Sequence, residues 1–261
     1  MRVIRGGGNL KLFPQSFCRV EKEIRKYQIG DRNHRVFGFT LAEVLITLGI
    51  IGIVAAMTMP VLVANYQKKQ TVSQLKKAYS TFAQALVQSQ FENGDSYEWE
   101  TTEPTSSYDD NLKYFETYWK PYLKIVKVCS TMSDCGYNIP GYASLSDLEH
   151  YYYYGQRTNT PGFIYGDGTY AYIRPYSENS TADSPRKLQL LSIDINGPKR
   201  PNVIGKDVFQ FQIDINKGVI SGYRDKDDCT INNIKIDTER ARACGGKILS
   251  DGWEIAKDYP W

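Results

Sequence analysis

The first third of the chain carries two successive patterns of apolar residues. From Val44 to Ala64 there are 21 residues without a charged side chain. As a helix this segment would span about 31 Å, which matches the hydrocarbon core of a lipid bilayer. From Val72 to Phe91 apolar residues instead recur at steps of three and four, which is typical of a helix that buries one face. We therefore expect one long helix from about Phe39 to Glu92, membrane-spanning in its first half and amphipathic in its second.

The second half of the chain has the pattern of a β-sheet. The expected strands are residues 162–165, 169–174, 188–194, 208–215 and 219–223. The first two flank Asp167-Gly168, which is a strong hairpin signal. Residues 95–160 are polar and rich in Tyr and Trp without clear periodicity, so we expect loops there, with short helical pieces such as Tyr114–Trp119. The pattern predicts an α+β fold, in which the long N-terminal helix packs on an antiparallel head of four or five strands.

One acidic residue, Glu43, lies near the start of the apolar helix. A carboxylate costs about 2.5 to 3.5 kcal/mol at the centre of a membrane and less near the interface. One explanation is local, because Thr40 and Glu43 have the spacing of a capping box. That explanation accounts for the carboxylate, but it gives no reason for Gly38 before the helix or for Pro60 within it.

The segment Gly38-Phe39-Thr40-Leu41-Ala42-Glu43 resembles the processing site of type IV prepilins and type II secretion pseudopilins. The resemblance implies that a prepilin peptidase in the membrane cuts after Gly38 and methylates the new amine of Phe39. Glu43 would then be residue 5 of the mature chain (43 − 38), at the family's signature glutamate, and Pro60 would be residue 22 (60 − 38), at its helix-kinking proline.

The resemblance also implies what the processed chain does. It would assemble with copies of itself and other pilin-like subunits, on an assembly platform in the inner membrane, into a type II secretion pseudopilus or type IV pilus. The amine of Phe39 is a cation at a helix N-terminus, and Glu43 of a neighbouring subunit can neutralise it inside the packed core. A secretory signal peptide is one alternative for the apolar segment, although its apolar core is shorter and its cleavage site follows that core. A plain signal anchor is another.

Charge divides the chain and predicts its orientation. The net charge is +3, but residues 1–38 carry nine Lys/Arg and three Asp/Glu, which gives +6 and leaves −3 for the remainder. A basic segment before an apolar helix is expected on the cytoplasmic side, with the head periplasmic or extracellular. The expected parts are a cleaved leader (1–38), a transmembrane or filament-core helix (39–64), its amphipathic continuation (65–94) and an exported α+β head (95–261). The negative mature chain makes nucleic acid an unfavourable partner.

Five cysteines are present, and Cys18 lies in the expected leader. The other four are Cys129, Cys135, Cys229 and Cys244. An even number in an exported domain suggests disulfides, for which four cysteines allow three connectivities. Proximity along the chain favours Cys129–Cys135 and Cys229–Cys244. Zinc is the competing explanation, but neither spacing resembles that of a zinc-binding pair.

A loop between two expected strands carries the candidate metal ligands Asp194, Asn196 and Asp207. It resembles the Asp-x-Asn-Gly…Gly-x-Asp-x-Phe segment of pseudopilin-like heads, some relatives of which bind calcium in a nearby loop. The three side chains offer the oxygen ligands that Ca²⁺ prefers. Asx-turn hydrogen bonding explains the same residues without a metal, and the nearby lysines and arginine oppose a cation. Both explanations stay open, and no other cofactor is expected.

Catalysis finds little support in the sequence. The expected head holds one histidine, His150, and neither a Gly-x-Ser-x-Gly, an HExxH nor a phosphate-binding motif occurs. We therefore expect a structural protein rather than an enzyme. The alternatives are a minor pilin whose head serves adhesion or DNA uptake, and a membrane-tethered exported binding domain or enzyme.

Overall fold

The computed structural model describes residues 38–103, 105–152, 156–176 and 187–261, so the expected leader and Cys18 lie outside the described residues apart from Gly38. The chain divides into two units, Met1–Ala56 and Met57–Trp261. Helix α2, Leu41–Asn93, contributes to both. It starts two residues later and ends one residue later than expected, so the predicted long helix is confirmed.

The described part of the first unit is the beginning of α2, and its apolar side chains are exposed. Leu45, Ile50 and Ile51 are each between 58% and 63% exposed. Among the described residues, α2 alone is long and apolar enough to cross a membrane. In water this surface would be unfavourable, because apolar area prefers an apolar surrounding. It therefore requires a lipid or protein cover.

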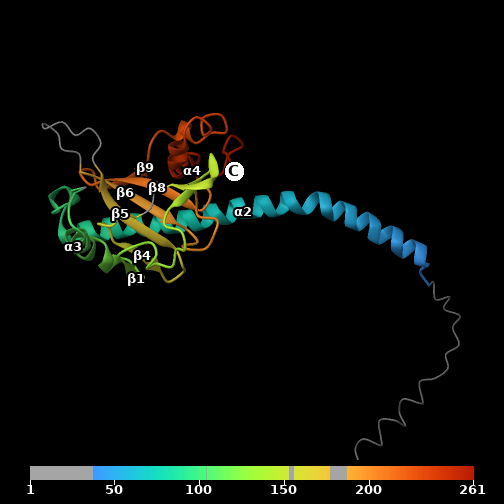
Figure 1. Ribbon diagram of the computed structural model, residues 1–261, viewed down its shortest axis with the longest axis horizontal. Coiled ribbons are helices and arrows are strands. Elements are labelled where there is room, and N and C mark those ends of the chain that lie inside the picture. The colour runs from blue at the N-terminus through green and yellow to red at the C-terminus, as the bar shows by residue number, and fades with distance from the viewer. Residues whose placement is uncertain (1–37, 104, 153–155, 177–186) are drawn as a thin grey trace, which may run out of the picture. The chain divides into compact units, whose positions relative to one another are not determined.

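The second unit combines the rest of α2 with a sheet and short helices (Figure 1). The remaining helices are α3, Tyr108–Tyr118, and α4, Cys244–Ser250, with short 3₁₀ turns at Ser96–Glu98, Lys120–Tyr122, Lys226–Asp228 and Thr238–Ala243. The strands are β1 Ile125–Cys129, β2 Tyr142–Ser144, β3 Asp147–Tyr152, β4 Gly162–Tyr165, β5 Tyr170–Tyr176, β6 Leu188–Asp194, β7 Val203–Ile204, β8 Val208–Asp214 and β9 Val219–Gly222. Helix α3 begins with a capping box between Ser107 and Asp110.

The described strands form one sheet in the order β1-β4-β5-β6-β8-β7-β2-β3, with β9 also paired to β8. The predicted α+β fold is confirmed, and β6 has the predicted bounds. Two details differ from expectation. The sheet is mixed, because β7 pairs in parallel with both β2 and β8. It is also larger than four or five strands, because β1, β2 and β3 form within residues 95–160, where loops and helical pieces were expected, and β7 forms in the segment between β6 and β8.

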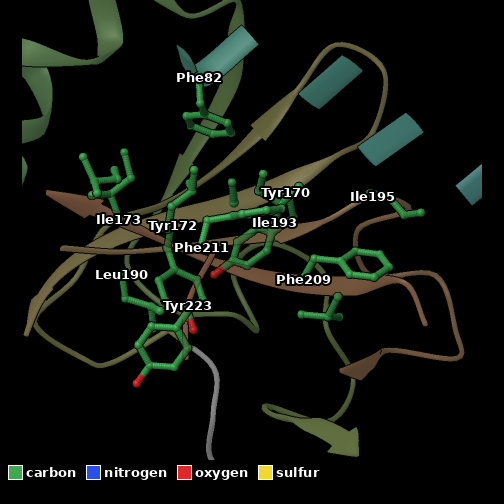
Figure 2. Close-up of a cluster of buried hydrophobic side chains, with 14 of the residues drawn as sticks. Phe82, Tyr170, Tyr172, Ile173, Leu190, Ile193, Ile195, Phe209, Phe211 and Tyr223 are labelled. Atoms are coloured by element: carbon green, nitrogen blue, oxygen red, sulfur yellow. The ribbon is translucent and has the colours of Figure 1, made fainter. Parts of the chain in front are cut away.

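The amphipathic half of α2 packs on this sheet through aromatic side chains. Phe82 is fully buried, and its ring centroid lies 6.1 Å from that of Phe163 and 5.7 Å from that of Tyr165. The Tyr79 ring lies 5.2 Å from that of Phe211 on β8. Figure 2 shows Phe82 above a layer of buried aromatic and aliphatic side chains from the sheet. The buried face of α2 that includes Tyr79 and Phe82, called the stripe below, is therefore the part of the helix that packs against the head.

Phe82→Ala should test this packing, with Val87→Ala as the control on the same helix. Removing a buried phenylalanine costs about 3 to 5 kcal/mol, whereas Val87 is 66% exposed and its truncation should change stability by less than about 0.5 kcal/mol. The measurement is chemical denaturation of the mature chain in nonionic detergent, followed by near-ultraviolet circular dichroism. Equal losses in both variants would contradict the docked stripe.

Candidate processing and assembly site

The residues around the expected cut are accessible. Gly38, Phe39 and Thr40 precede α2 without regular secondary structure and are exposed, Phe39 to 86%. A side chain built on Gly38 would meet no atom of the described residues within 4 Å. The described residues therefore give no packing reason for glycine at position 38.

Glu43 forms the capping box that its spacing predicted. Its Oε2 accepts hydrogen bonds from the Thr40 backbone N–H at 2.8 Å and from the Thr40 hydroxyl at 2.9 Å. In return, the Glu43 N–H donates to Thr40 Oγ1 at 3.2 Å. The box satisfies donors that the first turn of a helix leaves free. All of these contacts of the carboxylate use one oxygen, so the local role does not occupy Oε1.

Pro60 lies inside α2 without ending it. Proline has no N–H, so the carbonyl of Ala56 lacks its usual bond from the residue four positions later. The helix continues for 33 residues beyond Pro60, to Asn93 (93 − 60). A kink at this position stays a prediction.

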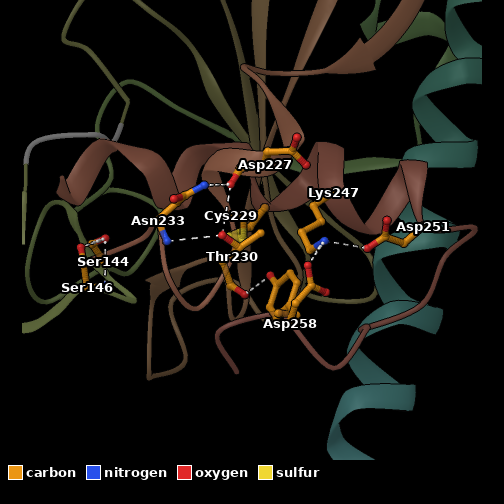
Figure 3. The surroundings of a disulfide bond; sticks show 12 residues. Ser144, Ser146, Asp227, Cys229, Thr230, Asn233, Lys247, Asp251 and Asp258 are labelled. Carbon is orange, nitrogen blue, oxygen red and sulfur yellow. Dashed lines mark hydrogen bonds and ion pairs between the residues drawn. A yellow bond between two sulfur atoms is a disulfide. The ribbon is translucent and has the colours of Figure 1, made fainter. Parts of the chain in front are cut away.

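Both disulfides favoured by proximity are present. Cys129 pairs with Cys135 and Cys229 with Cys244, with Cα–Cα distances of 5.6 Å and 5.0 Å. The second bond joins the segment after β9 to the start of α4 (Figure 3). The chain-entropy model assigns about 3 kcal/mol to a loop of this size. The bond thus fixes the C-terminal region to the sheet.

A buried lysine holds the last residues of the chain against this region. Lys247 Nζ lies 2.9 Å from Asp258 Oδ2 and 3.1 Å from Asp251 Oδ2, and Figure 3 shows it between the two carboxylates. Burial lowers the pKa of Lys247, but its hydrogen bonds to Asp258 and Asp251 outweigh this and raise it overall. We did not predict this contact, although Lys247 and Asp251 have the spacing of an ion pair on one helical face.

The three candidate metal ligands lie together, but protein donors occupy them. The Tyr137 hydroxyl donates to Asp194 Oδ2 at 2.6 Å. Asp207 accepts from the N–H groups of Asn202 and Val203 at 2.8 Å and 2.5 Å. The side-chain amide nitrogen of Asn196 donates to Asp207 Oδ2 at 3.1 Å, so its nitrogen rather than its oxygen faces the carboxylate.

This arrangement does not fit the calcium site considered from the sequence. Ca²⁺ takes six to eight oxygen ligands, whereas the carboxylates of Asp194 and Asp207 face hydroxyl and amide donors. In the described parts of the chain, no group of three His, Cys, Asp or Glu side chains is placed to hold a metal ion. The backbone N–H of Asn196 donates to Asp194 Oδ1 at 3.3 Å, as the Asx-turn explanation requires.

The loop buries two acids side by side. Asp194 is fully buried and Asp207 is 4% exposed. Burial raises the pKa of Asp194 well above its usual range, and the neighbouring Asp207 carboxylate raises it further. Burial also raises the pKa of Asp207, although the N–H groups of Val203 and Asn202 oppose this. Both carboxyls therefore bind protons more readily in the folded chain than in the unfolded chain.

Two families match the chain. The prokaryotic N-terminal methylation motif matches residues 33–59, which include Gly38, Phe39 and Glu43. A family described as being of unknown function, DUF6613, matches residues 61–261. Neither a curated protein nor a solved structure matches the chain. The two matches meet next to Pro60, so the motif and the remainder of the chain are recognised separately.

Asp194→Asn should change how stability depends on pH. A carboxyl whose pKa is raised on folding binds more protons in the folded state, so the free energy of unfolding decreases as pH rises above about 3.9 towards the folded pKa. Asn resembles the protonated acid and removes this decrease. We expect the variant and the parent protein to have similar midpoints of thermal unfolding near pH 4. At pH 7 the midpoint of the variant should be higher, by about 2 to 4 °C for each kcal/mol of stability gained.

Thermal unfolding of the mature chain in detergent across this pH range is the measurement. Asp109→Asn removes an exposed charge from α3 and should change the midpoint at pH 7 little. A variant at position 194 that loses stability with rising pH as steeply as the parent protein would show that Asp194 is not the group responsible.

Proposed function

The chain belongs to the family DUF6613 and carries the N-terminal methylation motif that marks type IV pilins and pseudopilins, and on this basis we propose that it is a structural subunit of a type II secretion pseudopilus or type IV pilus. Its anchor is a single described helix, α2. The head carries no assigned chemistry in this proposal. Its role is assembly, and the observation that carries the proposal is the motif at an exposed helix start.

Processing is the first step. Prepilin peptidase cuts between Gly38 and Phe39 and methylates the Phe39 amine. The exposure of this segment supports access of the enzyme. The basic residues before Gly38 keep the leader on the cytoplasmic side, so the head faces the periplasm or the exterior. Removal of the leader leaves Phe39 as the N-terminus of the mature chain, two residues before α2 begins.

Assembly then replaces lipid by protein around the apolar half of α2. The exposed side chains between Val44 and Ala64 need an apolar cover in both states. Glu43 gives the packing its register, because its carboxylate can meet the methylated amine of Phe39 on an adjoining subunit. Thr40 and Glu43 both remain after the cut, so the capping box can persist through Oε2 while Oε1 receives the amine.

The mature N-terminus tests processing directly. In cells with active prepilin peptidase, mass spectrometry should find a chain that starts at Phe39 and carries one additional methyl group. Gly38→Val should block the cut while leaving the head folded, because a side chain at position 38 meets nothing in the structure. A mature protein that keeps residues 1–38 would remove the proposed function.

Substitutions at Glu43 separate the local from the intermolecular role. Gln can take the place of Glu in a capping box but carries no charge, whereas Ala removes both functions. If charge pairing drives assembly, Glu43→Gln and Glu43→Ala should both lower incorporation into filaments about tenfold or more, since a broken buried ion pair costs about 3 to 5 kcal/mol.

Incorporation is measured as the fraction of subunit in sheared filaments relative to the membrane. Cleavage after Gly38 should continue in both variants and serves as the control for insertion. Normal assembly by Glu43→Gln, with a defect only in Glu43→Ala, would show that Glu43 acts as a helix cap and not through charge pairing between subunits.

A further inference from the structure

A cavity lies between α2 and the C-terminal segment of the head. Its volume is about 540 Å³, and its walls include Lys68, Lys69 and Val72 of α2 with Trp253 and Ile255 of the C-terminal segment. These five residues define what we call the Trp253 pocket. All of them belong to the second unit of the chain. Neither the methylation motif nor the packing of the sheet explains the pocket.

Trp253 is held in place against α2. Its φ is +68°, a left-handed conformation that bulky residues rarely adopt. The backbone N–H of Trp253 donates to the Ile248 carbonyl at 2.8 Å. This bond connects Trp253 to the end of α4. The indole meets the Tyr79 ring edge-on at 5.1 Å, and Lys76 Nζ lies 6.0 Å from its centroid. The fixed ring closes one side of the pocket.

The helix side of the pocket is strongly basic. Residues 57–79 contain four lysines and no acid. Lys77 is paired with Asp167 at 2.7 Å, whereas Lys68 and Lys69 take part in no ion pair among the described residues. Glu254 also lines the pocket and is the one acid in its described wall. The pocket thus presents two free cations beside apolar and aromatic side chains.

The position of these lysines along α2 indicates what they meet. Lys68 and Lys69 lie four and five residues after Ala64, the last residue of the apolar segment. At 1.5 Å per residue they lie about 6 to 8 Å beyond the hydrocarbon core, at the level of lipid headgroups. Lysine at this level is attracted to anionic lipid. Anionic headgroups are therefore the nearest complementary charge while the subunit is in the membrane.

We propose that the Trp253 pocket binds the headgroup of an anionic phospholipid, with the phosphate at Lys68 and Lys69 and the remainder of the headgroup against Trp253 and Ile255. The site would hold the head close to the membrane surface before assembly. This inference rests on the membrane-spanning part of the proposed function and not on cleavage after Gly38, so it can fail while processing succeeds, and the reverse.

The test uses the full chain purified from membranes into mixed micelles that contain equal amounts of phosphatidylglycerol and phosphatidylcholine. Native mass spectrometry measures the ratio of the two lipids that remain bound. We expect phosphatidylglycerol to be favoured. Because a lysine near an anionic surface contributes about fivefold in affinity, Lys68→Gln with Lys69→Gln should reduce this preference by up to about 25-fold.

Two further variants make the result specific to the pocket. Lys113→Gln with Lys217→Gln removes the same charge from exposed positions elsewhere on the head and should keep the preference. Trp253→Gly accepts the left-handed backbone easily while removing the ring, and it should lower the preference although every lysine remains.

Three results would overturn the proposal. The parent chain could show no preference for phosphatidylglycerol, or the control pair could lose as much preference as the pair at 68 and 69, which would indicate general charge attraction. The pair at 68 and 69 could also keep its lipid preference while losing incorporation into filaments. That last result would assign the pocket to a contact between subunits.

Discussion

One helix has to satisfy two environments, and this constraint organises the molecule. The first half of α2 exposes apolar side chains on all sides, and its second half buries one stripe against the sheet. The exposed half has no stable existence in water, because the cost of apolar hydration grows with its area. The exposed half therefore needs an apolar cover, which in the proposed function is lipid before assembly and neighbouring helices after it.

The head is attached to the amphipathic half of α2 by several independent contacts. Phe82 and Tyr79 pack against aromatic rings of β4 and β8, and β6 is buried along its whole length. The disulfide between Cys229 and Cys244 and the ion pairs of Lys247 fix the C-terminal segment to the same body. As a consequence, Trp253 stays beside the helix just beyond its membrane-spanning part, where it closes the proposed lipid pocket.

The sequence predicted those parts of the fold that depend on interactions between residues close together in the chain. The helix, the hairpin at Gly168, strand β6 and both disulfides follow from periodicity, turn residues and short separations along the chain. Strands β1 to β3 did not, because residues 95–160 show no clear periodicity and these strands are defined by their partners in the sheet. The Tyr137 hydroxyl that meets Asp194 comes from 57 residues away, so no local signal could reveal that the suspected calcium loop is satisfied by hydrogen bonds. The spacing of Thr40 and Glu43 predicted the capping box. The proposed pairing of Glu43 with another subunit involves a second chain, so the structure of one chain does not test it.

The accessibility of single cysteines along α2 in intact cells shows whether the apolar half of the helix is shielded from water. Replacing Cys18 leaves no other unpaired cysteine, since the remaining four form disulfides. A cysteine at each position from 44 to 72 is then treated with a membrane-impermeant maleimide. We expect no labelling from 44 to 64 and labelling at exposed positions after Asn65. Uniform labelling of the apolar half would contradict it, because those side chains would then face water.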